Sequence, residues 1–166
     1  MLSPSIPKSG SQRNARPMDV EMLAQWWPLL LRLIVGYGFF MHGYAKFMRG
    51  PETFAVVLHT LGTPMPLLFA WVTTLTELVG GIAVLLGAFV SIVSIPMMVI
   101  LMTALLTIHL PYGFFSVKLV EVTAGGTKFG PVGYEVILLY LASLGALVLG
   151  GAGPLSLDHW RLRRRG

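Results

Sequence analysis

Residues 78–117 read LVGGIAVLLGAFVSIVSIPMMVILMTALLTIHLPYGFFSV and contain no Asp, Glu, Lys or Arg. A helix that crosses a bilayer needs about 20 consecutive apolar residues, because the hydrocarbon core is about 30 Å thick and a helix rises 1.5 Å per residue. The stretch is long enough for one complete span and for part of another. We therefore expect an integral membrane protein.

The composition of the whole chain supports this expectation. Of its 166 residues, 55% are hydrophobic and 11% are charged, whereas a soluble domain carries about 25% charged residues. The absence of cysteine excludes a disulfide framework, a thiol nucleophile and an iron–sulfur cluster. The formal net charge is +5, and the basic residues are concentrated at the two ends. This distribution favours contact with anionic lipid and gives no indication of nucleic-acid binding.

Two other uncharged stretches, residues 53–76 and 136–157, flank the long one. The first continues across Glu77 into the long stretch, and together they predict a span over 66–89. The remainder of the long stretch predicts a span over 92–112. Small and polar residues set the break between these two spans, namely Gly87, Ser91 and Ser94.

The first span has to carry charge. Arg32 and Lys46 bracket only 13 uncharged residues, which is too few to cross a bilayer, so a span over 27–48 contains one or both of them. The last uncharged stretch predicts a span over 132–151. Residues 26–152 are therefore predicted to have an all-α fold, an integral membrane antiparallel four-helix bundle.

The two tails decide the predicted orientation. Residues 1–25 are rich in Ser, Pro and basic residues, which predicts a disordered tail without a cleavable signal peptide. Residues 153–166 form a basic tail. Four spans place both tails on one side of the membrane, with seven basic residues: Lys8, Arg13, Arg16, Arg161, Arg163, Arg164 and Arg165. The positive-inside rule then predicts cytoplasmic N- and C-termini, in a bacterial inner membrane.

Two connecting segments lie on the outer side. Residues 49–65 have apolar residues at helical spacing and predict a short amphipathic helix at the interface. Residues 113–131 form the longest loop, in which one short alternating run gives little evidence for a strand. Small residues repeat every four positions in two spans and predict close helix contacts there: Ala142, Ala146 and Gly150, and Ala83 and Gly87.

Six ionisable side chains fall inside the predicted spans: Arg32, His42, Lys46, Glu77, His109 and Glu135. Such a group costs a few kcal/mol or more at membrane depth unless it is paired or hydrated. At 100° per residue, the three on the first span share one side of the helix. The rise per residue places Glu77 near the midplane and His42, His109 and Glu135 toward the outside. We expect a polar cluster that opens outward.

The cluster has several interpretations. Glu77 has to be protonated, paired or hydrated, and an ion pair with Arg32 or Lys46 would fix the register of the helices. Of these we assign Arg32–Glu77 as the structural pair. Lys46 and Glu135 could instead reach the interface from the helix ends. His42 and His109 could ligate a haem iron, but no other feature supports haem, and we predict no metal site.

Four segments together resemble the DoxX family of small membrane proteins. RLIVGYGFFMHGYAKF, from Arg32 to Phe47, resembles the first helix of that family, which has an Arg followed by a His-Gly-x-x-Lys-type motif. LTELVGGIAVLLG contributes Glu77, TIHLPYGFF contributes His109, and GYEVILLYLA contributes Tyr134 and Glu135. The resemblance covers about residues 27–152. The family includes proteins related to the membrane subunit of a thiosulfate:quinone oxidoreductase, and others that resemble partners in complexes resisting oxidative and thiol stress.

Three functions from different classes remain open. A redox membrane subunit would bind quinone at His42, Lys46, Glu77, His109 and Glu135, because quinone reduction needs hydrogen-bond donors and protons. A non-catalytic scaffold or assembly factor would use the same charges to specify the fold. A transporter is least favoured, since inverted repeats and broken helices are absent. The sequence assigns no catalytic residue and leaves open whether the chain is an enzyme. The implied partners are the lipid bilayer and a redox partner subunit or a second copy of the chain.

Overall fold

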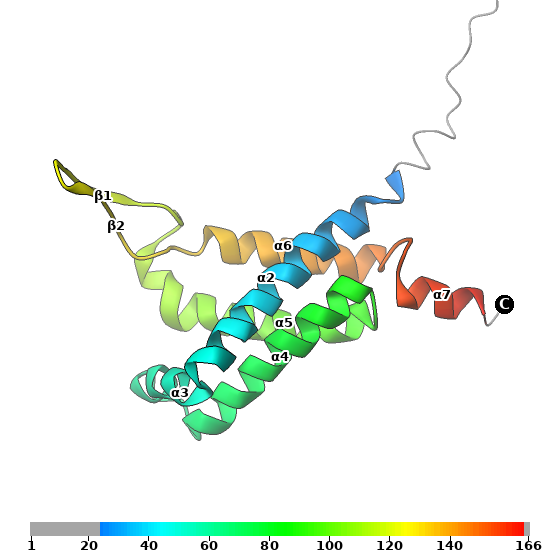
Figure 1. The fold of residues 1–166 in the computed structure, drawn as a ribbon, viewed down its shortest axis with the longest axis horizontal. Helices are drawn as coiled ribbons and strands as arrows, with labels where there is room; N and C mark the ends of the chain where they lie inside the picture. The colour runs from blue at the N-terminus through cyan, green and yellow to red at the C-terminus, as the bar shows by residue number, and fades with distance from the viewer. Residues whose placement is uncertain (1–23, 165–166) are drawn as a thin grey trace, which may run out of the picture.

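Four long helices dominate the computed structural model, which describes residues 24–164. They are α2 (Trp27–Arg49), α4 (Pro66–Leu86), α5 (Val90–Ala104) and α6 (Glu135–Gly150), and consecutive ones run in opposite directions (Figure 1). A π-helical turn, η1 (Leu105–His109), and a 3-10 turn, η2 (Leu110–Tyr112), extend α5. The chain is mostly helical, as predicted, and each long helix falls on a predicted span.

Length and composition single out two of these helices. Among the described residues, the segments Pro66–Leu86 and Val90–Tyr112 are long and apolar enough to cross a membrane, and Glu135–Gly150 is apolar but shorter. The helix α2 has 23 residues, or about 34 Å of axial length, and it carries Arg32 and Lys46. Its length suits a span, while its charges need partners inside the protein.

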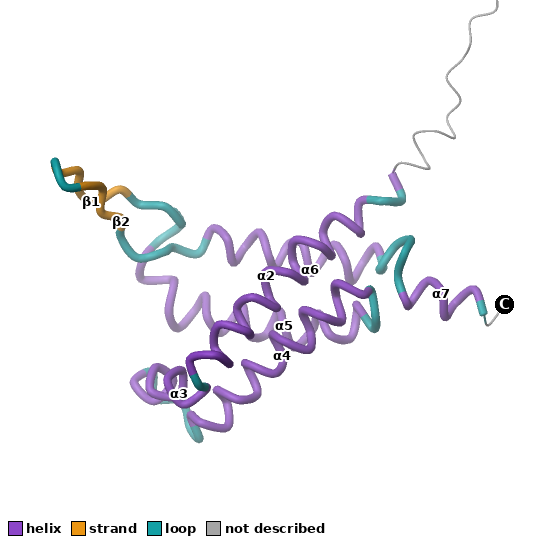
Figure 2. Tube along the Cα trace, viewed as in Figure 1, coloured by secondary structure: helices purple, strands orange, loops and turns teal. Residues whose placement is uncertain are grey.

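The shorter elements occupy the two ends of the molecule. The helix α3 (Pro51–Thr60) confirms the predicted short helix within 49–65. It lies at the same end as the antiparallel hairpin of β1 (Leu119–Thr123) and β2 (Gly126–Phe129), while α7 (Leu157–Arg163) lies at the opposite end (Figure 2). The hairpin and α7 add to the predicted fold. The predicted disordered tail, 1–25, falls almost wholly outside the described residues.

The turn between α4 and α5 depends on one glycine. Gly87 has φ +66° and Phe89 has φ +50°, so the chain leaves α4 through two left-handed residues. A Cβ on Gly87 would lie 2.7 Å from the guanidinium carbon of Arg32, which explains why a side chain is excluded there. Ser91 and Ser94, predicted to belong to the break, lie inside α5 instead.

The closest helix contact joins α2 to α4 through glycines. A Cβ on Gly81 would lie 2.6 Å from the backbone nitrogen of Phe40 and 2.8 Å from the carbonyl oxygen of Gly36. The two backbones therefore touch without intervening side chains, as small residues permit in membrane helices. Of the small residues predicted for this role, Ala142 is exposed and Gly150 packs on the ring of Trp27.

The Gly81→Ala substitution is expected to destabilise the protein by about 1–3 kcal/mol, because the added methyl meets backbone atoms that cannot move aside. The matched control is Gly145→Ala, since a Cβ there has nothing within 4 Å and alanine is the better helix former by roughly 0.5–1 kcal/mol. Thermal unfolding in detergent measures both. If Gly81→Ala unfolds at the same temperature as Gly145→Ala, the two helix backbones are not in contact.

The core is small and the apolar exterior is large. Buried side chains from all four long helices form one cluster: Val35, Phe39, Val84, Val90, Met97, Leu144 and Leu147. Large apolar side chains also remain exposed along the helices, and Leu149 is the extreme at 90%. Soluble monomers rarely expose continuous apolar surface beyond a few hundred Å². This exterior therefore suits contact with lipid.

Candidate functional site

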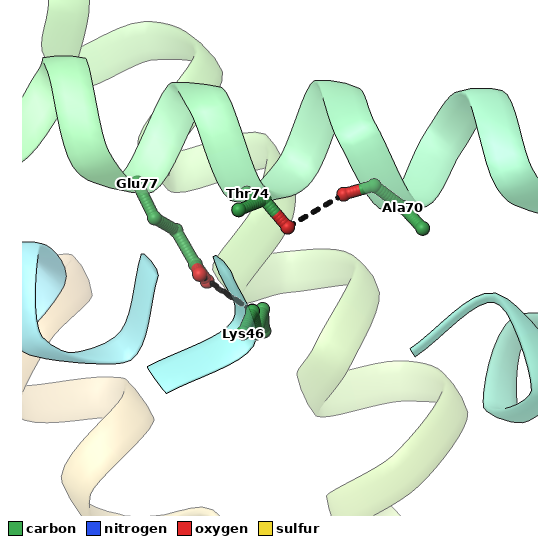
Figure 3. Close-up of polar contacts among 4 residues, drawn as sticks. All are labelled: Lys46, Ala70, Thr74 and Glu77. Atoms are coloured by element: carbon green, nitrogen blue, oxygen red, sulfur yellow. Dashed lines mark hydrogen bonds and ion pairs between the residues drawn. The ribbon is translucent and has the colours of Figure 1, made fainter. Parts of the chain in front are cut away.

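Lys46 and Glu77 form an ion pair between α2 and α4. The Nζ atom of Lys46 lies 2.6 Å from each carboxylate oxygen of Glu77. Figure 3 shows the two side chains pointing at one another, with Thr74 one turn earlier on α4 donating a hydrogen bond to the carbonyl of Ala70 at 2.8 Å. The carboxylate side chain is 7% exposed and the lysine side chain 23%. The Glu77 carboxylate is therefore largely shielded from its surroundings, while the Lys46 ammonium remains partly accessible to a ligand.

Local packing explains how the pair forms. Gly43 precedes Lys46 by three residues on α2, and a Cβ there would lie 2.7 Å from the backbone nitrogen of Leu78. This close approach brings Lys46 within reach of Glu77. The helix α3 completes the surroundings, because Nζ lies 4.7 Å from the centre of the Phe54 ring, within the range of a cation–π interaction.

Arg32 makes a different set of contacts, and its predicted pairing with Glu77 is wrong. The guanidinium is 1% exposed and lies at the other end of α2, 14 residues before Lys46, or about 21 Å along the helix axis. Its nitrogens donate to five carbonyl oxygens at 2.8–3.4 Å: those of Val84, Leu85, Ala152, Pro154 and Leu155.

The chemistry of a helix end accounts for this placement. The last carbonyls of α4 have no partner within the helix, and a cation is favoured at a helix C-terminus. Arg32 meets this need and also holds the linker between α6 and α7. Its five donors match the five acceptors.

His109 ends the π-helical turn η1. Its Nδ1 lies 2.9 Å from the carbonyl oxygen of Val132. A carbonyl only accepts, so Nδ1 carries the proton in this hydrogen bond, and Nε2 is the acceptor nitrogen when the ring is in its neutral form. Pro111, two residues later, has no N–H to donate, and the chain turns away from the helix there. The ring is half-buried.

Glu135 opens α6 and joins it to the base of the hairpin. Its Oε2 accepts a hydrogen bond from the backbone N–H of Ser116 at 3.2 Å, and the Ser116 hydroxyl accepts one from the N–H of Val136, also at 3.2 Å. A carboxylate is favoured in the first turn of a helix. These two hydrogen bonds join the start of α6 to the base of the hairpin.

The structure brings together only part of the predicted cluster. Lys46 and Glu77 are in contact, while His109 and Glu135 lie near the hairpin base. His42 is exposed on α2. Within residues 24–164, no hydrogen bond or ion pair joins the Lys46–Glu77 pair to His42, His109 or Glu135. In the same residues, no group of three or more His, Cys, Asp or Glu side chains could hold a metal ion.

Comparison with known proteins places this site in a family. The family model DoxX matches residues 27–110, which include Arg32, Lys46, Glu77 and His109. The chain belongs to the DoxX family. The match of this DoxX protein therefore covers α2 to η1 and both residues of the ion pair. No solved structure matches the chain.

Two curated relatives extend the DoxX match over most of the chain. An uncharacterized protein of Haemophilus influenzae is 29% identical over 143 residues, covering 85% of this chain and 95% of that protein. A Bacillus subtilis protein named "Putative oxidoreductase CatD" is 36% identical over 130 residues, covering 78% of this chain and 83% of that protein.

Proposed function

We propose that this DoxX protein is a redox-associated membrane subunit that binds a quinone head group beside Lys46 and Glu77. The observation that carries the proposal is the half-open ion pair, with the carboxylate 7% and the ammonium 23% exposed. A lysine has three N–H donors, so Lys46 can hold Glu77 and also donate to a carbonyl oxygen. A preformed cation at that oxygen favours the more anionic, reduced form.

Proton supply and ring packing support the same site. Reduction of a quinone to a hydroquinone consumes two electrons and two protons, and carboxylate and ammonium groups can pass protons. The electrons come from a redox partner subunit. One aromatic face lies at the site, because the Phe54 ring covers the ammonium. On the same two helices, the rings of Phe47 and Trp71 pack edge-on with their centroids 6.4 Å apart. The relative from Bacillus subtilis is named an oxidoreductase, which supports a redox association.

The remaining predicted residues belong to the proposal in a secondary role. His42 lies one turn before Lys46 on α2 and is the nearest imidazole along that helix. His109 presents Nε2 as an acceptor because Nδ1 is bound to Val132, and Glu135 lies at the same end of the molecule. We assign His42 to a quinone oxygen, and His109 and Glu135 to proton exchange with the outer side.

Quinone extraction tests this function directly. The purified protein should release quinone into organic solvent, detectable by mass spectrometry, and Lys46→Met should release much less because the cation at the carbonyl oxygen is lost. Lys118→Met on the hairpin is the matched control and should retain the wild-type amount. Wild type carrying no more quinone than Lys46→Met, with no thermal stabilisation by added quinone, would reject the proposal.

A scaffold or assembly factor is the second candidate. The observation that favours it is that every N–H of Arg32 is bound to a backbone carbonyl, together with the hydrogen bond that Glu135 accepts from the loop residue Ser116. A chain whose buried charges serve only its own fold needs no ligand. The extraction experiment separates the two candidates, since a scaffold releases no quinone.

We further propose that α2, α4, the α5–η2 segment and α6 each cross the bacterial inner membrane, with both termini in the cytoplasm. A reporter active only in the periplasm should then give no signal when fused after Gly166. The same reporter inserted at Gly125, between β1 and β2, should be active. A strong signal from the C-terminal fusion would exclude the four-span topology.

A further inference from the structure

The helix α7 is fixed to the end of the molecule opposite the Lys46–Glu77 pair. The Asp158 carboxylate accepts hydrogen bonds from the backbone N–H groups of Phe89 and Val90 at 2.8 and 3.0 Å, and the N–H of Asp158 donates to the carbonyl of Gly87 at 3.0 Å. Ser156, 6% exposed, caps the helix by accepting from the N–H of His159. The start of α7 is therefore anchored to the turn between α4 and α5.

An open, mostly apolar groove lies between α7 and the end of α4. Its volume is about 440 Å³, and Arg32 and Ser156 line it together with five apolar side chains: Leu85, Leu86, Leu155, Leu157 and Trp160. Leu86 is 54% and Leu155 72% exposed. Since α4 is one of the two helices long and apolar enough to cross a membrane, the groove opens where that helix ends. In the four-span topology proposed above, lipid acyl chains would reach this end of α4.

Two arginines at the end of α7 lie over aromatic rings, and one of these rings, Trp160, lines the groove. The guanidinium of Arg164 lies 3.6 Å from the centre of the Trp160 ring, and that of Arg161 lies 4.5 Å from the centre of the Phe89 ring. A guanidinium that stacks on a ring keeps its N–H edges available for an anion. Within residues 24–164, neither arginine has an ion-pair partner, and the nearest carboxylate along the helix, Asp158, is bound to backbone N–H groups.

We propose that this groove binds one anionic phospholipid, with its phosphate at Arg161 and Arg164 and an acyl chain against Leu86 and Trp160. The two parts of the site demand two different chemistries in one ligand, an anion and a hydrocarbon chain. A free phosphate ion would leave the apolar walls uncovered, and a neutral lipid would leave the arginines without a counter-charge. The cytoplasmic leaflet supplies anionic lipid, on the side where the proposed topology places α7.

Lipid retention by the full-length protein tests this site. The protein is purified in a neutral detergent, and retained lipid is measured by native mass spectrometry with phosphatidylglycerol or phosphatidylcholine of identical acyl chains. Phosphatidylglycerol should be retained preferentially. Because an arginine near an anionic lipid strengthens binding roughly fivefold, the Arg161→Gln/Arg164→Gln variant should bind it at least about tenfold more weakly. The Lys118→Gln/Lys128→Gln variant removes the same charge from the hairpin and should bind as wild type does.

The other outcomes overturn the proposal. Equal retention of phosphatidylcholine would show that the arginines do not select the ligand. An equal loss in the hairpin variant would show that only net charge matters. Displacement of the lipid by inorganic phosphate, or unchanged binding in Trp160→Ala, would show that the apolar groove takes no part. Quinone content, measured on the same samples, reports the proposed redox site independently of these results.

Discussion

Replacing Glu77 by alanine should lower the free energy of unfolding in detergent by about 3 kcal/mol, the lower end of the range for a fully buried pair, because it leaves the partly buried Lys46 ammonium without its counter-charge. Both carboxylate oxygens lie 2.6 Å from Lys46 Nζ, and this is the only ion pair among residues 24–164. The close contact of α2 and α4 at Gly43 lies one turn from Lys46, so loss of the pair acts directly on this helix contact. The loss of stability is therefore expected mainly at the contact between α2 and α4.

Two further variants show whether the cost belongs to the pair. Glu52→Ala removes an exposed carboxylate from α3 and should leave the melting temperature close to that of wild type. Lys46→Met/Glu77→Leu removes both charges and should recover much of the lost stability, because an apolar pair of similar volume is often at least as stable as a buried ion pair. Equal melting temperatures for Glu77→Ala and Glu52→Ala would mean that the pair contributes nothing to stability.

Arg32→Lys should destabilise the protein by about 3 kcal/mol or more, although it preserves the charge. Hydrogen bonds from a charged donor contribute about 1.5–3 kcal/mol each, and an ammonium has three donors where the guanidinium uses its planar fork to reach five carbonyls. One lysine cannot reach both the end of α4 and the linker before α7. We expect the linker to lose its attachment first.

The Arg32→Lys substitution should lower the stability of the whole protein and also release the linker between α6 and α7. The melting temperature reports the whole protein, and the rate of cleavage within 151–156 by a protease of broad specificity reports release of the linker. Arg49→Lys, at the exposed end of α2, makes the same chemical change and should alter neither measurement. If Arg32→Lys melts like wild type and the linker stays protected from cleavage, the five carbonyls do not depend on the arginine.

The helices could be predicted from the sequence because charge spacing is a strong signal in a membrane protein. The predicted spans 27–48 and 66–89 correspond to Trp27–Arg49 and Pro66–Leu86. The difference at the second boundary has a local cause, since Gly87 adopts a left-handed conformation and ends α4 early. The hydropathy of the sequence does not show that the backbone becomes left-handed at Gly87.

The site was harder to predict because its partners are not all side chains. The expected pairing of Arg32 with Glu77 assumed that a buried cation needs a carboxylate, whereas backbone carbonyls at the end of α4 and in the linker before α7 bind it instead. The correct partner, Lys46, was among the alternatives. His109 and Glu135 depend on the base of the hairpin through Val132 and Ser116, and such contacts follow from the path of a loop that periodicity does not describe.

The five carbonyl acceptors of Arg32 are synthesised long after Arg32 itself. Its last acceptor, Leu155, is 123 residues later in the chain. At a synthesis rate of about 5–20 residues per second, that interval lasts on the order of ten seconds. During this time α2 is already made, yet its guanidinium lacks the acceptors of the α6–α7 linker. In the proposed topology, Arg32 of the nascent first helix therefore needs a hydrated or sheltered place until the linker between α6 and α7 has been made.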